Sequence, residues 1–146
     1  MDVGKPFSEL DSKLQALAEA AISVKAKAYC PYSEFKVGCA VLTENGQIFE
    51  GCNVENASYG LSICAERVAL VKAVSEGHLK FQALAVVCEV KDSFKGSCGA
   101  CRQFMAEFGL NWDVYLIKPD RTWMKVTVKE LYPLAFCPDA LKEQRI

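Results

Sequence analysis

Two short cysteine motifs, separated by a long stretch of chain, constrain the fold of this sequence more than any other feature. The first is Cys64-Ala65-Glu66 and the second is Cys98-Gly99-Ala100-Cys101. Two cysteines with two residues between them can bind one metal ion, because the short turn directs both sulfurs to the same side. Cys64 would complete three protein ligands, and catalytic zinc keeps its fourth position for water. The sequence therefore predicts a fold that joins both motifs around one open zinc site.

Glu66 follows a predicted ligand by two residues, which places a carboxylate near the metal without making it the obvious fourth ligand. Zinc lowers the pKa of a bound water far below its bulk value. A neighbouring carboxylate can then carry the proton that this water releases. Three cysteine ligands with such a glutamate are typical of zinc deaminases.

Two other interpretations of the cysteines were weighed. The chain has eight cysteines, which in a secreted protein would suggest a disulfide framework, but the first ten residues are polar and lack the apolar core of a signal sequence. A structural zinc site needs a fourth protein ligand. The one histidine, His78, follows a predicted helix end and is expected to face solvent. An open catalytic site is favoured.

Composition limits the classes of partner. The chain has 146 residues, enough for one domain over residues 1–146 with a substantial core. Its formal charge is −1 and it has no basic run, which disfavours nucleic acid as a partner. No apolar stretch approaches the roughly 20 residues that span a bilayer, so no membrane partner is expected. Reduced cysteines favour an intracellular, cytoplasmic location, with the nucleus as an alternative.

Apolar periodicity and turn residues predict alternating helices and strands. Ser8 and Asp11 suggest the start of a first helix that extends to about residue 28, and Thr127 with Glu130 suggests a capping box for a short last helix. Further helices are predicted over 63–76 and 99–108. Strands are predicted over 35–43, 48–54, 81–90, 113–117 and 123–128.

This order predicts an α/β fold of three layers, α/β/α, around a mixed five-stranded sheet. The turn between the last two strands is too short for a parallel crossover, so this final pair is expected to be antiparallel. Two helices are expected to start at the metal ligands. The partial positive charge at a helix start favours thiolates there.

The chain closely resembles the small homotetrameric, zinc-dependent cytidine deaminases of pyrimidine salvage. The resemblance covers nearly everything beyond residue 25 and implies a cytidine-deaminase-like fold. The motifs that carry it are Tyr29-Cys30-Pro31-Tyr32-Ser33, Phe35-Lys36-Val37-Gly38, Gly51-Cys52-Asn53-Val54-Glu55-Asn56-Ala57, Cys64-Ala65-Glu66-Arg67, Cys98-Gly99-Ala100-Cys101-Arg102-Gln103 and residues 131–138. Two positions depart from the family pattern: Ser97, where proline is usual, and Cys137, where glycine is frequent.

The resemblance implies hydrolysis of cytidine and 2′-deoxycytidine to uridine and 2′-deoxyuridine with release of ammonia. It also implies one Zn²⁺ per subunit, bound by Cys64, Cys98 and Cys101, with Glu66 as the proton carrier. Arg67 is expected to donate hydrogen bonds to the cysteine sulfurs, a role that its positive charge beside anionic ligands also suggests.

The resemblance further assigns the substrate contacts. Asn53 and Glu55 would bind the ribose 3′-hydroxyl. Phe35 would pack against the base, and Ala65 would contact it through its backbone. Other pocket residues, some reaching in from a neighbouring subunit of a homotetramer, would be Tyr32, Ala57, Tyr59 and Phe136.

Three rival functions stay open at this point. A deaminase of cytosine in DNA or RNA would need a basic surface that the sequence lacks. A deoxycytidylate deaminase would need phosphate-binding residues, which are not evident. A zinc-stabilised binding module without catalysis would need a fourth protein ligand and would not need Glu66.

Overall fold

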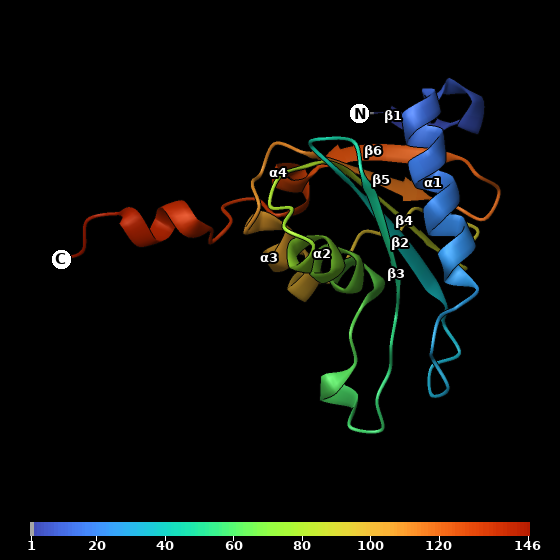
Figure 1. Cartoon of the computed structure of the whole chain (residues 1–146), viewed down its shortest axis with the longest axis horizontal. Coiled ribbons are helices and arrows are strands. Elements are labelled where there is room, and N and C mark those ends of the chain that lie inside the picture. The colour runs from blue at the N-terminus through green and yellow to red at the C-terminus, as the bar shows by residue number, and fades with distance from the viewer. Residues whose placement is uncertain (1) are drawn as a thin grey trace.

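The computed structural model describes residues 2–146 and has one mixed sheet between two layers of helices (Figure 1). The sheet has six strands in the order β1-β6-β5-β4-β2-β3. The strands are β1 (Asp2–Lys5), β2 (Val37–Thr43), β3 (Ile48–Cys52), β4 (Phe81–Cys88), β5 (Asp113–Ile117) and β6 (Trp123–Thr127). The α-helices are α1 (Ser12–Lys25), α2 (Ala65–Ser75), α3 (Gly99–Ala106) and α4 (Val128–Leu131). Short 3₁₀ turns span Phe7–Glu9, Tyr59–Leu61 and Pro138–Lys142.

The expected three-layer α/β fold is confirmed, but the expected number of strands is wrong. The sheet has six strands rather than five because β1 pairs antiparallel with β6 at one edge. Residues 2–5 read Asp-Val-Gly-Lys, which carries no alternating apolar pattern. This strand therefore forms because it pairs with the backbone of β6, and its own side chains do not indicate a strand.

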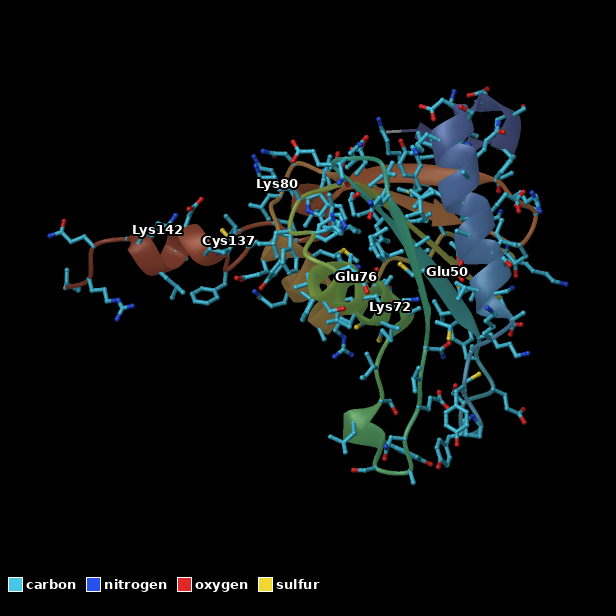
Figure 2. All side chains as sticks on the ribbon, viewed as in Figure 1. Glu50, Lys72, Glu76, Lys80, Cys137 and Lys142 are labelled. Carbon is cyan, nitrogen blue, oxygen red and sulfur yellow. The ribbon has the colours of Figure 1, made fainter. Side chains whose placement is uncertain are left out.

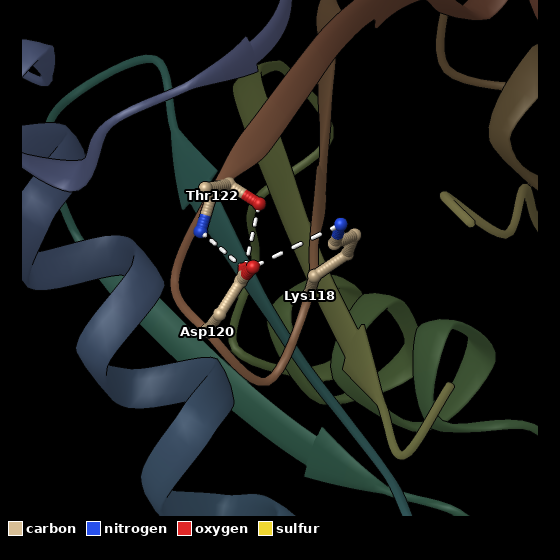
Figure 3. A network of polar contacts seen from close by, with 3 residues as sticks. All are labelled: Lys118, Asp120 and Thr122. Carbon is tan, nitrogen blue, oxygen red and sulfur yellow. Dashed lines mark hydrogen bonds and ion pairs between the residues drawn. The ribbon is translucent and has the colours of Figure 1, made fainter. Parts of the chain in front are cut away.

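The predicted antiparallel pairing of β5 with β6 is confirmed, with Tyr115 opposite Lys125 at its centre. The connecting turn is held by Asp120, which accepts hydrogen bonds from the backbone N–H of Thr122 at 3.0 Å and from its hydroxyl at 2.6 Å (Figure 3). Lys118 lies 3.8 Å from the same carboxylate. Arg121 takes a left-handed φ of 69°, which lets the chain reverse within this short connection.

The first helix starts one turn later than the sequence suggests. Asp11 is its N-cap and accepts a hydrogen bond from the backbone N–H of Leu14 at 2.9 Å, whereas Ser8 lies in the preceding 3₁₀ turn. The capping box of α4 is confirmed, with Thr127 and Glu130 each bonding the other's backbone N–H.

Two cores lie on opposite faces of the sheet. On one face α1 packs over β2 and β4, and the buried residues there include Leu17, Leu42 and Trp123. On the other face α2 and α3 cover a core that includes Leu70 and Met105. Because the central strands have a core on each face, they are apolar nearly throughout, as expected of a sheet interior.

Both helix layers approach the sheet closely at glycines. A Cβ atom on Gly38 of β2 would lie 2.1 Å from the carbonyl oxygen of Ala21 in α1. A Cβ on Gly51 of β3 would lie 2.5 Å from the backbone nitrogen of Ala69 in α2. Neither backbone atom can move without shifting its helix. Glycine is therefore required at both positions by the distance between helix and sheet.

Gly38→Ala is expected to lower the free energy of unfolding by about 3 kcal/mol, the upper end of the usual overpacking cost. Chemical denaturation followed by circular dichroism measures this change. Gly60→Ala is the matched control, because a Cβ there meets no atom within 4 Å. Equal stability of the two variants would contradict the close approach of α1 to β2.

Candidate metal centre and substrate cavity

The topology brings the two cysteine motifs to the same end of the strands, the carboxyl-terminal end of β3 and β4. β3 and β4 both run antiparallel to β2, so their carboxyl ends point the same way. α2 follows β3 and α3 follows β4, and both helices therefore begin at this end of the strands. Cys64 is the N-cap residue of α2 and Cys98 is that of α3. The prediction that two helices start at the ligands is confirmed.

The three predicted ligands form a compact cluster. Cys64, Cys98 and Cys101 have sulfurs that all lie within 4.8 Å of one another, and those of Cys64 and Cys98 are 3.7 Å apart. Two sulfurs bound at about 2.3 Å to a tetrahedral zinc would lie about 3.8 Å apart. All eight cysteines are free of disulfides. The donor set therefore fits a zinc ion with three protein ligands.

The charges around the cluster favour a thiolate at Cys64. Its pKa is lowered to about 5, first by the hydrogen bond from Cys101 and then by those from Arg67 and Cys98. The Nη2 of Arg67 lies 3.7 Å from the Cys64 sulfur, where the sequence placed it. The same pairing with Cys64 raises the pKa of Cys101. The lowered pKa favours a Cys64 thiolate, which is stabilised by the Arg67 guanidinium and can bind a cation.

Glu66 lies beside the cluster in the first turn of α2 and is 5% exposed. Burial raises the pKa of its carboxyl, and an interaction with Ser97 partly opposes this rise. A carboxyl with a raised pKa is better matched to proton transfer near neutral pH than a free glutamate.

A cavity of about 290 Å³ adjoins the cluster, close to the lower end of the ~300–1,000 Å³ usual for small-molecule sites. It brings together most of the residues that the sequence proposed. Its lining contains Phe35, Asn53, Glu55, Cys64, Ala65, Glu66 and Cys98. Cys101 is fully buried behind this wall. A larger hollow of about 450 Å³ around His78 and Lys80 contains none of these groups, so the cavity at the cysteines is the candidate site.

The remaining predicted contacts lie outside this cavity. Tyr32 and Tyr59 line an adjacent hollow of about 300 Å³, which shares Glu55 with the first. Their rings lie 5.6 Å apart. Ala57 is exposed on the loop before α2 and lines neither hollow. Phe136 is 59% exposed on the C-terminal segment, which extends away from the sheet (Figure 1). One chain alone does not bring these two residues to the site.

Asn53 and Glu55 hold the segment that carries Phe35. The Asn53 amide accepts a hydrogen bond from the N–H of Val37 at 2.9 Å and donates one to the carbonyl of Phe35 at 2.8 Å. Glu55 accepts from the backbone N–H groups of Tyr32 and Ser33, each at 3.1 Å, and from the Ser33 hydroxyl. These bonds, that of the Ser33 hydroxyl first, lower the pKa of Glu55.

Several cavity residues were not identified from the sequence as part of the site. They are Ser33, Val37, Val86, Cys88, Lys95 and Gly96, together with Ser97, which was noted only as a departure from the family pattern. Two of them, Lys95 and Gly96, lie in the polar loop before Cys98, and no spacing rule connects such a loop with a cavity. For these two, the available signal was proximity in sequence to the predicted ligand Cys98, whereas Ser33 and Val37 stand in motifs that carry the family resemblance.

Cys98→Ala is expected to reduce bound zinc from one ion per chain to well below half, because two thiol ligands then remain. Metal analysis after purification measures the stoichiometry. Cys137→Ala is the matched control and should keep its zinc, since Cys137 lies outside the cluster. Full zinc content in the Cys98 variant would exclude this sulfur as a ligand.

Comparison with known proteins identifies the family. Residues 11–117 match the family model described as the cytidine and deoxycytidylate deaminase zinc-binding region. The chain is 48% identical over 129 residues to a probable cytidine deaminase of Dictyostelium discoideum, covering 88% of this chain and 87% of that protein. It is 45% identical to a cytidine deaminase of Halalkalibacterium halodurans, covering 88% and 98%. The crystal structure of a Burkholderia pseudomallei cytidine deaminase superposes with a TM-score of 0.79 at 48% identity, covering 83% and 97%. The chain therefore belongs to the zinc-binding cytidine and deoxycytidylate deaminase family.

Proposed function

We propose that this chain, as a single deaminase domain, hydrolyses cytidine and 2′-deoxycytidine to uridine and 2′-deoxyuridine, with release of ammonia. The observation that carries the proposal is the position of Glu66, which is buried beside a three-thiol cluster in the wall of a nucleoside-sized cavity. The similarity to cytidine deaminases over most of the chain supports the same reaction.

Cys64, Cys98 and Cys101 would hold the zinc ion, which would supply an acidified water as the nucleophile near neutral pH. Glu66 accepts the proton of the attacking water and transfers it to ring N3. It would then take a second proton from the hydroxyl now on C4 and transfer it to the amine, which leaves as ammonia while the oxygen stays on C4 as the carbonyl of uridine. Arg67 offsets the negative charge of the thiolates.

The substrate contacts follow from the hydrogen-bonding capacity that remains in the cavity. A carboxylate has about four acceptor sites, and Glu55 uses three of them on the 32–33 backbone and Ser33. Asn53 keeps one N–H and one lone pair free. We assign both residues to the ribose 3′-hydroxyl. Phe35 packs against the base, and Ala65 contacts it through its backbone.

A homotetramer is the proposed assembly, with pockets shared between subunits. Large apolar side chains are exposed around the second hollow and along the C-terminal segment: Tyr32, Tyr59, Leu61, Ile63, Leu134 and Phe136. Figures 1 and 2 show the loop before α2 and the C-terminal segment, which carries Cys137 and Lys142, extending beyond the layered core. Tyr32, Ala57, Tyr59 and Phe136 would line the pocket, some of them reaching in from a neighbouring chain.

The cysteines, which are all free of disulfides, support a cytoplasmic location for the protein. Within residues 2–146, no helix has both the length and the apolar character needed to cross a membrane.

The zinc-loaded protein is expected to convert cytidine to uridine, followed as a change in ultraviolet absorbance. Deoxycytidylate and a single-stranded oligonucleotide containing cytosine are the comparison substrates. Faster turnover of deoxycytidylate would assign the site to nucleotides, and comparable turnover of the oligonucleotide would assign it to nucleic acid. No turnover of any of the three would refute the proposed function.

Glu66→Gln is expected to keep one zinc per chain and to lose at least about 10²-fold in kcat, because an amide cannot carry the proton. Steady-state kinetics and metal analysis on the same preparation measure both quantities. Glu76→Gln is the control, since Glu76 is exposed at the opposite end of α2 (Figure 2). Retention of most activity by the Glu66 variant would remove this residue from the mechanism.

Analytical ultracentrifugation is expected to give a mass about four times the 16.1 kDa of one chain. Phe136→Ala should raise KM at constant zinc content if this ring enters a neighbouring pocket. Lys142→Ala, on the same segment with an exposed charged side chain, is the control. A monomer with full activity would contradict the shared pocket.

A further inference from the structure

Ser97 lies directly before the ligand Cys98, and its backbone is hydrogen-bonded to Arg102 of α3. The carbonyl oxygen of Ser97 accepts a hydrogen bond from the Nε of Arg102 at 2.6 Å. The same guanidinium donates from Nη1 to the carbonyl of Leu131 at 2.7 Å. A Cβ on the preceding Gly96 would meet Arg102 at 2.9 Å, so the loop lies tightly against this side chain. The position of Ser97 is therefore fixed by its main chain.

The side chain of Ser97 is buried at the cavity wall. The residue is 5% exposed and forms part of the cavity lining, but its Oγ is closed to solvent. Within residues 2–146, this oxygen has no partner at hydrogen-bonding geometry. A buried hydroxyl without a partner is unfavourable. Because the oxygen is shielded from the cavity, the partner that it needs must be a group of the protein and not the substrate.

Glu66 is a buried acceptor that can satisfy this hydroxyl, whereas Arg67 Nε, also buried and unpartnered among the described residues, is a donor and cannot accept the hydroxyl proton. Among the described residues, the buried polar or charged ones are Thr43, Glu66 and Ser97. The hydroxyl of Thr43 is already bonded to Asn45 at 2.5 Å. Glu66 and Ser97 line the same cavity, and both are 5% exposed.

We propose that Ser97 is a positioning residue, whose hydroxyl donates a hydrogen bond to the Glu66 carboxylate and fixes its orientation toward the sulfur cluster. The inference rests on the proposed function, because it assigns Glu66 the proton transfer. One carboxylate oxygen bonded to Ser97 leaves the other oxygen for the protons of the reaction.

Ser97→Ala is expected to lower kcat about tenfold, or about 1.4 kcal/mol in activation free energy, with KM within twofold of wild type and zinc content unchanged. Ser97→Thr keeps the hydroxyl and should restore kcat to within threefold. Ser75→Ala is the matched control, because it removes an exposed serine hydroxyl from the far end of α2. Circular dichroism of each variant establishes that it is folded.

A crystal structure of the zinc-loaded wild type gives a readout independent of turnover. The Ser97 Oγ is expected about 2.5–3.0 Å from a Glu66 carboxylate oxygen. A separation beyond about 3.5 Å would overturn the inference, as would a Ser97→Ala variant with more than half of the wild-type kcat or with a raised KM at unchanged kcat. If the wild type does not deaminate cytidine, the proposed function fails, and the distance still decides whether Ser97 holds Glu66.

Discussion

The parallel relation between β3, β4 and β5 is the constraint on which the metal centre depends. β4 pairs parallel with β5, and β3 runs in the same direction on the far side of β2. Parallel strands need a crossover connection, and here both crossovers are helices. α2 and α3 must therefore begin at the same end of the strands, which is where their N-cap cysteines meet. The ligands are remote in sequence, but the strand directions leave their two helices one common starting point.

The closeness of helix and sheet makes this arrangement rigid. Gly51 lets the backbone of α2 lie against β3, so the first turn of α2, with Cys64 and Glu66, cannot move outward without losing buried contacts. At its C-terminal end α2 is tied to the sheet by Lys72, whose Nζ donates to the carbonyl of Glu50 at 2.5 Å (Figure 2 labels both residues). Elsewhere in the cavity lining, Asn53 and Glu55 fix the segment that carries Phe35. A site built in this way is preorganised by backbone contacts.

The sequence predicted those elements that are determined by interactions between residues close together in the chain. The strand over 113–117 and the capping box of α4 each depend on neighbouring residues, and each was found where expected. The metal cluster was also predictable, because thiol spacing restricts the chemistry to very few metals. β1 was not predictable, since it exists through the free edge of β6 and not through its own residues. The anchoring bonds of Asn53 and Glu55 were not predictable either, because they depend on how a loop folds back on a strand end.

The edge strand β1 has a consequence for the behaviour of the sheet in concentrated solution. An open strand edge invites pairing with other molecules, and natural sheets protect such edges with short, irregular or charged strands. β1 covers the outer edge of β6 with four residues, its register shifts between Asp2 and Lys5, and Gly4 takes a left-handed φ of 65°. Pro6 follows at once and has no N–H to offer. A short, irregular strand thus closes this side of the sheet against edge-to-edge aggregation.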